Sequence, residues 1–121
     1  MTLRTVAGTP AYMAPEVMGI CPLDETIQRD SYTGAIDIWS LGQICYRILT
    51  GDVAFSDMRL VYEYVTHGGE FPAAPLAKQS VTSECTEFVA QTLKASARKR
   101  LSYQAGFEHP WIRQQSRSNI M

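Results

Sequence analysis

The stretch 35–50 (AIDIWSLGQICYRILT) constrains the fold more than any other, because apolar residues occupy nearly the whole circumference of a helix built from it. Polar residues interrupt it only on one narrow stripe, three to four positions apart: Asp37, Ser40, Gln43, Arg47 and Thr50. A helix that is apolar on most sides lies in the middle of a fold or in a membrane, and this one is too short and too polar for a membrane span of about 20 residues. The stretch therefore predicts a buried central helix that ends at Gly51.

Shorter helices are predicted on both sides of this stretch. Proline suits a first helical turn, so a short helix is expected to begin near Pro15. Ser56 is expected to cap a helix over 57–67, with a glycine pair as its terminator. Apolar residues at helical spacing predict another helix over 83–95, and Ser102 is expected to cap a final short helix that a proline interrupts.

The remaining segments carry no periodic signal. Residues 1–13 are expected to form a loop, and residues 20–34 a polar connector. No segment alternates polar and apolar residues with a period of two, so no sheet is expected. The predicted fold class is mainly α.

Composition limits the kinds of protein that this chain can be. Its 121 residues suit one domain, and 11 basic against 12 acidic residues leave a net charge of −1, which argues against binding nucleic acid. No apolar run is long enough for a membrane span, and no charged start followed by an apolar stretch marks a signal peptide, so neither is expected. Three widely spaced cysteines (Cys21, Cys45 and Cys85) form no disulfide framework. We expect a soluble intracellular domain, cytoplasmic or nuclear, with no membrane partner.

No group of residues in the sequence forms a complete catalytic or metal-binding motif by itself. His67 and His109 are 42 residues apart and lack ligand-spaced cysteines or carboxylates, so no metal site is expected. Asp24 and Glu25 could act together as a functional carboxylate pair. We favour the alternative that they are adjacent acidic residues of a solvated loop. The basic run 97–100 is a nuclear-localisation or nucleic-acid patch or, as we favour, a set of cations at a helix C-terminus.

One motif is highly specific. Residues 5–16 (TVAGTPAYMAPE) carry G-T-P-x-Y-x-A-P-E, the end of the activation segment in protein kinases. Further matches follow in the family's order: D-x-W-S-L-G at 37–42, G-x-x-F-P at 68–72, R-x-S at 100–102 and H-P-W-I at 109–112. The chain thus resembles the eukaryotic Ser/Thr protein kinases, and the calcium/calmodulin-dependent and related branches are the most similar.

The resemblance implies a partial kinase domain. Residues 1–113 are similar to the lower half of the C-lobe, with a short αEF, a buried central αF and then αG, αH and αI, and residues 114–121 form a polar C-terminal tail. The Gly-rich loop, the strand lysine, H-R-D and D-F-G are not in the chain. The resemblance therefore implies no catalytic residue, metal or cofactor here, with ATP and Mg bound by the complete family enzyme.

The resemblance also assigns roles to residues of the loop. Thr5 is at the place where many members are phosphorylated, although an ordinary loop threonine remains the alternative. Gly8, Thr9, Pro10 and Tyr12 resemble the P+1 loop, which receives the substrate residue after the acceptor, and the threonine there points to Ser/Thr acceptors.

Other matching positions have structural roles in the family. Glu16 is expected to pair with Arg100, Asp37 to bind the catalytic-loop backbone, and Trp39 to pack near the A-P-E proline. Ser96 and Ala97 depart from the family's Asp-Pro, so the loop before Arg100 is expected to be less rigid. The structural set is Ala14, Pro15, Glu16, Asp37, Trp39 and Arg100.

Two functions stay open at this point. The first is a Ser/Thr protein kinase fragment that carries the P+1 loop and C-lobe scaffold, is inactive alone and acts on a protein substrate. The second is a non-catalytic interaction module that binds a partner kinase. If the chain is such a fragment, parts of the central helix are expected to lack a cover and to promote self-association, namely several of Ile36, Ile38, Leu41, Ile44, Cys45, Ile48 and Leu49.

Overall fold

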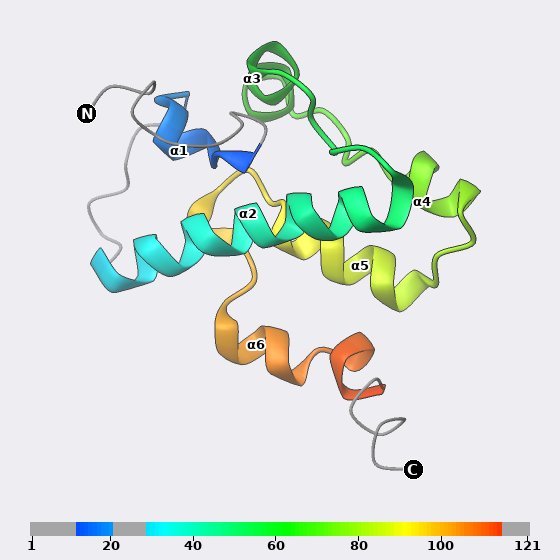
Figure 1. The fold of residues 1–121 in the computed structure, drawn as a ribbon. Helices are drawn as coiled ribbons and strands as arrows, with labels where there is room; N and C mark the ends of the chain where they lie inside the picture. Colours follow the sequence, from blue (N-terminus) through cyan, green and yellow to red (C-terminus); the bar gives the residue numbers. More distant parts are fainter. Residues whose placement is uncertain (1–11, 21–28, 115–121) are drawn as a thin grey trace.

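The computed structural model describes residues 12–20 and 29–114, and this part of the chain is mainly helical with no β-strand (Figure 1). A single 3₁₀ turn, Ala97–Lys99, lies between the last two helices, and residues 110–114 are helical as well. The predicted mainly α class without a sheet is confirmed for the described residues. The α-helices are α1 Pro15–Met18, α2 Arg29–Thr50, α3 Met58–Thr66, α4 Ala74–Lys78, α5 Ser83–Thr92 and α6 Tyr103–Glu108.

The long helix α2 is central, as its sequence predicts. It crosses the middle of the molecule in Figure 1, with α1 and α3 on one side and α6 on the other, while α4 and α5 contact it directly. Ile38, Trp39 and Tyr46 are its buried apolar residues. No described helix is long and apolar enough to cross a membrane.

The start of α2 was predicted wrongly. The helix begins at Arg29, so residues 29–34 of the predicted connector 20–34 form its first turns. Once a helix has nucleated, each further residue adds a hydrogen bond to the existing ladder. A polar extension of a packed helix therefore needs no apolar period, and the sequence pattern does not reveal it.

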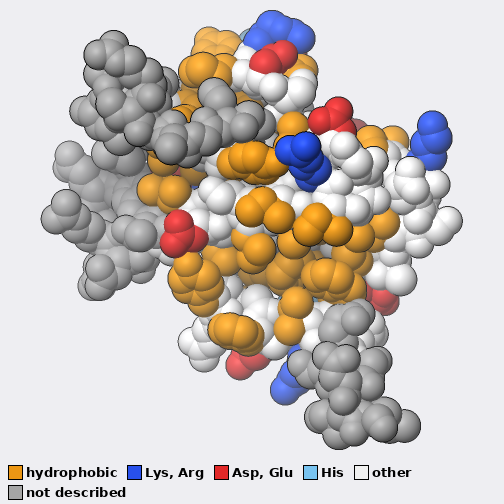
Figure 2. All heavy atoms as spheres, viewed as in Figure 1, with side chains coloured by type: hydrophobic (Ala, Val, Ile, Leu, Met, Phe, Trp, Pro, Cys, Tyr) orange, Lys and Arg blue, Asp and Glu red, His pale blue; other side chains and the backbone are white. Residues whose placement is uncertain are grey.

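One face of α2 is uncovered. Leu41, Ile44 and Ile48 are 41%, 46% and 77% exposed, and Asp37 lies on the same face. Figure 2 shows hydrophobic side chains gathered across the middle of the molecule in the view of Figure 1. The helix is therefore not buried on all sides. The partial lack of a cover predicted from the sequence is confirmed for these three apolar residues, whereas Ile38 is buried.

The ends of the other helices differ from the prediction in small but explicable ways. The cap of α3 is Asp57 and not Ser56, since the Asp57 carboxylate accepts from Leu60 N at 3.0 Å. The predicted cap at Ser102 is confirmed, because its hydroxyl oxygen accepts from Ala105 N at 3.1 Å. The short helix α4, with Pro75 in its first turn, lies between the helices predicted over 57–67 and 83–95, where the sequence pattern predicts no helix.

Helix α5 ends at Thr92, three residues before its predicted end. The next three carbonyl groups accept hydrogen bonds from other elements: Leu93 O from the Tyr64 hydroxyl, and Lys94 O and Ala95 O from Arg100. Tertiary donors thus replace the helical hydrogen bonds here. The apolar pattern over 83–95 contains no sign of these donors.

Candidate functional site

A buried ion pair joins the A-P-E stretch to the end of the chain's basic run. Arg100 Nη1 donates to Glu16 Oε2 at 2.8 Å, and Nη2 donates to Glu16 Oε1 at 3.1 Å. The two side chains are 0% and 2% exposed and 84 positions apart in the sequence. This two-pronged geometry is the strongest form of an arginine–carboxylate contact. The predicted pair is therefore present.

The rest of the Arg100 guanidinium is satisfied by backbone carbonyl groups. Nε donates to Lys94 O at 2.9 Å, Nη1 to Ala35 O at 3.0 Å and Nη2 to Ala95 O at 3.0 Å. All five N–H groups of the side chain are thus used. Its central carbon also lies 5.2 Å from the centre of the Trp39 ring, within the range of a cation–π contact. One side chain therefore connects α1, α2 and the segment after α5.

Tyr12, the only described member of the predicted P+1 loop, is held by two residues of α2. The Ser40 hydroxyl donates to Tyr12 O at 2.8 Å, and Arg47 Nη1 donates to the Tyr12 hydroxyl oxygen at 2.8 Å. This hydrogen bond raises the pKa of the exposed Arg47 guanidinium further above its usual range. Ser40 and Arg47 belong to no motif that would indicate this contact, although their i, i+7 spacing places them on one face of a helix.

The polar stripe on α2 is therefore an anchoring surface for neighbouring loops. Besides Ser40 and Arg47, it contains Gln43, which is fully buried and whose Oε1 accepts from Ala54 N at 2.9 Å. The single hydroxyl donor of Thr50 lies 2.9 Å from Tyr46 O, within α2, and 2.9 Å from Asp52 O, in the segment that follows α2. Four of the five polar residues of the stripe thus contact neighbouring segments, while Asp37 lies with the apolar residues on the exposed face.

The A-P-E residues themselves are buried. Ala14 belongs to the same buried cluster as Trp39, and Pro15 is among the fully buried side chains. Trp39 Nε1 is buried without a hydrogen-bond partner. The burial of these residues agrees with the structural roles that the resemblance implies for them, and the predicted contact between Trp39 and Pro15 remains a prediction.

Asp37 lies apart from the ion pair. It is exposed, and its Oδ2 accepts from the Tyr103 hydroxyl at 3.2 Å. The predicted role of Asp37 toward a catalytic loop stays a prediction. Several other predicted residues lie outside the described part of the chain: Thr5, Gly8, Thr9, Pro10, Cys21, Asp24 and Glu25.

The two histidines have different surroundings. His109 is buried: its Nε2 lies 3.2 Å from Glu87 Oε1, and its Nδ1 accepts from Trp111 N at 3.1 Å. His67 is exposed at the end of α3. Among the described residues, no three His, Cys, Asp or Glu side chains are grouped so that they could hold a metal ion.

The basic run 97–100 forms the 3₁₀ turn and the residue that follows it. Because Arg100 is turned inward onto Glu16, it cannot belong to an exposed nucleic-acid patch.

The two described cysteines have raised thiol pKa values. Burial raises the pKa of the Cys45 thiol. Burial is also the larger cause of the raised pKa of the Cys85 thiol, and the electrostatic interaction with Cys45 is the smaller cause. Neither thiol is thereby activated as a nucleophile. The described site thus clamps a loop in place.

The sequence profile of the protein kinase domain matches residues 1–112. The chain is 33% identical to the serine/threonine-protein kinase H1 homolog of Danio rerio, over 98% of this chain and 26% of that protein. It is 32% identical to the serine/threonine-protein kinase RAD53 of Saccharomyces cerevisiae, over 92% of this chain and 14% of that protein. The chain thus spans about a quarter or less of these relatives.

Solved structures of kinase domains are similar in fold. The Rad53 kinase domain with SCD2 in complex with AMPPNP has a TM-score of 0.65 at 29% identity, covering 84% of this chain and 38% of that one. The autoinhibited serine kinase domain of titin has a TM-score of 0.62 at 25% identity, covering 87% of this chain and 30% of that one. The helical arrangement matches part of the kinase domain in each case. The family profile matches nearly the whole length of the chain, and these relatives and structures agree with it. The chain therefore belongs to the protein kinase domain family.

Proposed function

We propose that the chain is part of a Ser/Thr protein kinase, the segment that holds the substrate loop on the lower half of the C-lobe. Residues 1–113 are the partial kinase domain in this proposal, and residues 114–121 are its polar tail. The observation that carries it is the Arg100 clamp, which ties the A-P-E stretch to α2 and to the segment after α5. Ser/Thr kinases among the relatives support the choice of acceptor. Within them, we place the chain near the calcium/calmodulin-dependent branch, in an intracellular compartment.

In this proposal the anchored loop binds the protein substrate. Gly8, Thr9, Pro10 and Tyr12 form the P+1 loop, and Thr5 is its regulatory phosphorylation site. Ser40 and Arg47 set the position of the loop through Tyr12. Phosphoryl transfer depends mainly on positioning and electrostatics, so a fixed substrate loop contributes to the rate even though it performs no chemistry.

The chain alone is inactive in this proposal. The resemblance assigns Mg·ATP binding to the Gly-rich loop, the strand lysine, H-R-D and D-F-G, and these motifs do not occur in the sequence, so no step is assigned to the described residues. The uncovered apolar face of α2 (Leu41, Ile44 and Ile48) supports dependence on a further part of a kinase domain, which would cover it.

Two measurements test the proposal. The coding sequence upstream of Met1 is expected to contain H-R-D-x-x-x-x-N and D-F-G in frame. Radiolabelled ATP with a generic basic protein substrate is expected to give no incorporation with the 121-residue chain and clear incorporation with the extended product. An inactive extended product, or activity of the short chain free of contaminating kinases, would contradict the proposal.

A non-catalytic interaction module that binds a partner kinase is the second candidate. The uncovered face of α2 favours it too, because an exposed apolar surface of this kind is typical of protein interfaces. An in-frame stop codon directly upstream of Met1 would favour the module over the kinase fragment.

A further inference from the structure

Arg47 is an exposed cation beside the loop that the proposed function assigns to the substrate. It lies in the last turn of α2, and its Nη1 donates to the Tyr12 hydroxyl oxygen at 2.8 Å. Tyr12 is itself anchored, because the Ser40 hydroxyl donates to its carbonyl oxygen at 2.8 Å. The guanidinium is therefore held against a fixed partner. A ligand that binds it need not order a mobile side chain, which lowers the entropic cost of binding.

Most of the hydrogen-bonding capacity of Arg47 is unused in the described part of the chain. An arginine has five N–H donors in a planar fork. The structure shows a partner for Nη1 alone, so Nε and Nη2 have none among the described residues. The edge of a guanidinium that carries Nε and Nη2 matches the two oxygens of a carboxylate or of a phosphate. This edge of Arg47 is thus suited to an anionic group.

The charge of Arg47 also forms no ion pair among the described residues. The Tyr12 hydrogen bond is the largest cause of the raised Arg47 pKa, and Asp52 is a smaller one. The Asp52 carboxylate instead accepts from Val53 N at 2.8 Å. The described ion pairs join other residues, namely Arg59 with Glu63, Arg100 with Glu16 and His109 with Glu87. Arg47 therefore presents a positive charge beside the loop.

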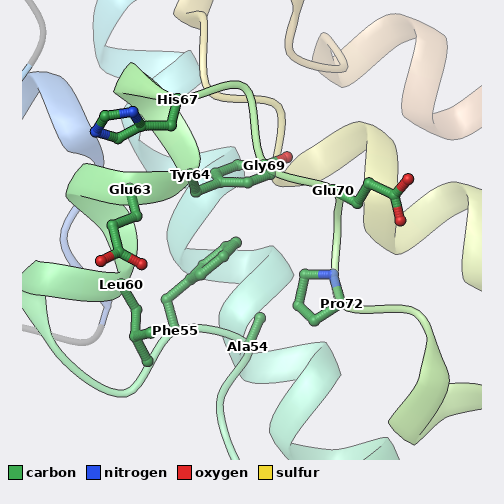
Figure 3. A pocket seen from close by; sticks show the side chains of 9 residues that line it. All are labelled: Ala54, Phe55, Leu60, Glu63, Tyr64, His67, Gly69, Glu70 and Pro72. Carbon is green, nitrogen blue, oxygen red and sulfur yellow. The ribbon is translucent and has the colours of Figure 1, made fainter.

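A groove beside α3 does not account for the binding of an anion. It has a volume of about 550 Å³ and lies next to α3 and to the segments before and after it (Figure 3). Its lining residues include no Lys or Arg: they are Ala54, Phe55, Leu60, Glu63, Tyr64, His67, Gly69, Glu70 and Pro72. Neither Arg47 nor Tyr12 lines the groove, so the two sites are separate.

We propose that Arg47 selects protein substrates with an anionic side chain, a carboxylate or a phosphate, close to the acceptor residue. Its Nε and Nη2 would donate to the two oxygens of that group, while Nη1 stays on Tyr12. A lysine or arginine at the same place in the substrate would be repelled by the like charge. The inference rests on the proposed function, which makes Tyr12 part of the loop that binds the substrate.

Nuclear magnetic resonance measures binding directly on the full 121-residue chain without ATP. Each of four short peptides has one serine flanked on both sides by a test residue, which is glutamate, phosphoserine, glutamine or lysine. We expect the glutamate and phosphoserine peptides to shift the Arg47 Nε–Hε and Tyr12 amide signals, and to bind about 2- to 5-fold more tightly than the glutamine peptide. High salt should remove this difference, because it screens exposed charges. The ratio of the two anionic peptides shows whether carboxylate or phosphate is preferred.

Protein variants, followed at the amide signal of position 12, separate recognition from loop anchoring. Arg47→Gln removes the charge and should abolish the preference for anionic peptides, whereas Arg47→Lys keeps the charge without the fork and should retain part of it. Tyr12→Phe removes the hydrogen bond but not the charge, so the preference should weaken and persist. Arg59→Gln, at an arginine of α3 that is 68% exposed, is the control and should keep the full preference. A merely structural loss would change all four peptides alike, so the ratio between peptides is the readout.

Two results would overturn the inference: anionic peptides that bind no more tightly than the glutamine peptide, or an Arg47→Gln variant that keeps the preference. The complete kinase domain provides a second test, in which we expect a higher kcat/KM for the glutamate peptide than for the glutamine peptide. Equal kcat/KM for both would contradict selection by Arg47 and leave the proposed function standing. Phosphorylation of no peptide would contradict the proposed function alone, because the binding experiment decides the inference without phosphoryl transfer.

Discussion

At the scale of single residues, Arg100 has more tertiary hydrogen bonds than any side chain near it. Its five N–H groups are divided between one carboxylate and three carbonyl groups from two regions of the chain. A buried charge is tolerated only with such complete pairing, because desolvation is otherwise too costly. Removing the arginine would leave the buried Glu16 carboxylate without its counter-charge. It would also leave the carbonyl groups of Ala35, Lys94 and Ala95 without this hydrogen-bond donor.

Arg100→Ala should therefore lower the free energy of unfolding by about 3–5 kcal/mol. Arg100→Lys keeps the charge but has only three donors for five contacts, so an intermediate loss is expected. Urea unfolding of the complete kinase domain, where the apolar face of α2 is expected to be covered, followed by circular dichroism, measures both. Lys99→Ala, an exposed site one residue earlier, is the control and should change stability by less than about 0.5 kcal/mol. Similar losses for Arg100→Ala and Lys99→Ala would show that the clamp contributes little.

At the scale of elements, the contact between α2 and α5 depends on a residue without a side chain. A Cβ atom at Gly42 would clash with Thr92 Oγ1 and lie 2.9 Å from Leu93 Cδ2. Thr92 and Leu93 are both fully buried, and the Thr92 hydroxyl is fixed by donating to Val89 O at 2.6 Å. The glycine thus lets the two helices approach closely at the centre of the fold.

Gly42→Ala should force these helices apart and destabilise the fold by about 1–3 kcal/mol, even though alanine is the better helix former. Gly106→Ala is a matched control inside α6, because its Cβ would lie 3.5 Å from Leu101, an ordinary contact. It should be neutral or stabilising by up to about 1 kcal/mol. Thermal unfolding of both variants makes the comparison, and a stabilising Gly42→Ala would contradict the close approach.

At the scale of the whole molecule, the uncovered face of α2 decides how the chain behaves alone. Covering a large apolar side chain contributes about 1.5–3 kcal/mol, against a total stability of about 5–15 kcal/mol for a small domain. In the isolated chain much of this contribution is missing at Leu41, Ile44 and Ile48, because their side chains are exposed. We expect a helical, loosely packed species that binds ANS and self-associates.

Ile44→Gln combined with Ile48→Lys should reduce both ANS binding and self-association, with a stability change below about 0.5 kcal/mol. Lysine is favourable at position 48 because it lies near the C-terminus of α2. Analytical ultracentrifugation with ANS fluorescence measures the effect. Met58→Gln on α3, where the methionine is 42% exposed, is the control and should leave both signals unchanged. A monomeric unmodified chain with a sharp unfolding transition and no ANS signal would contradict the expectation and show that the chain folds without a further part of a kinase domain.

The sequence alone determined the features that depend on local pattern or on motif order. Helical periodicity and caps predicted the mainly α class, the central helix, and the Ser102 cap. The motif order, through the family resemblance, predicted the Glu16–Arg100 pair across 84 positions. These features are accessible because periodicity and motifs are properties of the chain itself.

Only the tertiary structure decided which side of α2 is covered and what its polar stripe does. Residues 35–50 are apolar almost all round, so no pattern distinguishes the exposed Ile48 from the buried Ile38. Ser40 and Arg47 bind Tyr12, and Gln43 binds the backbone of Ala54, through contacts between segments distant in sequence. The early end of α5 and the groove beside α3 have the same origin. Each depends on which donors and rings the folded chain brings together, and a one-dimensional pattern does not contain that information.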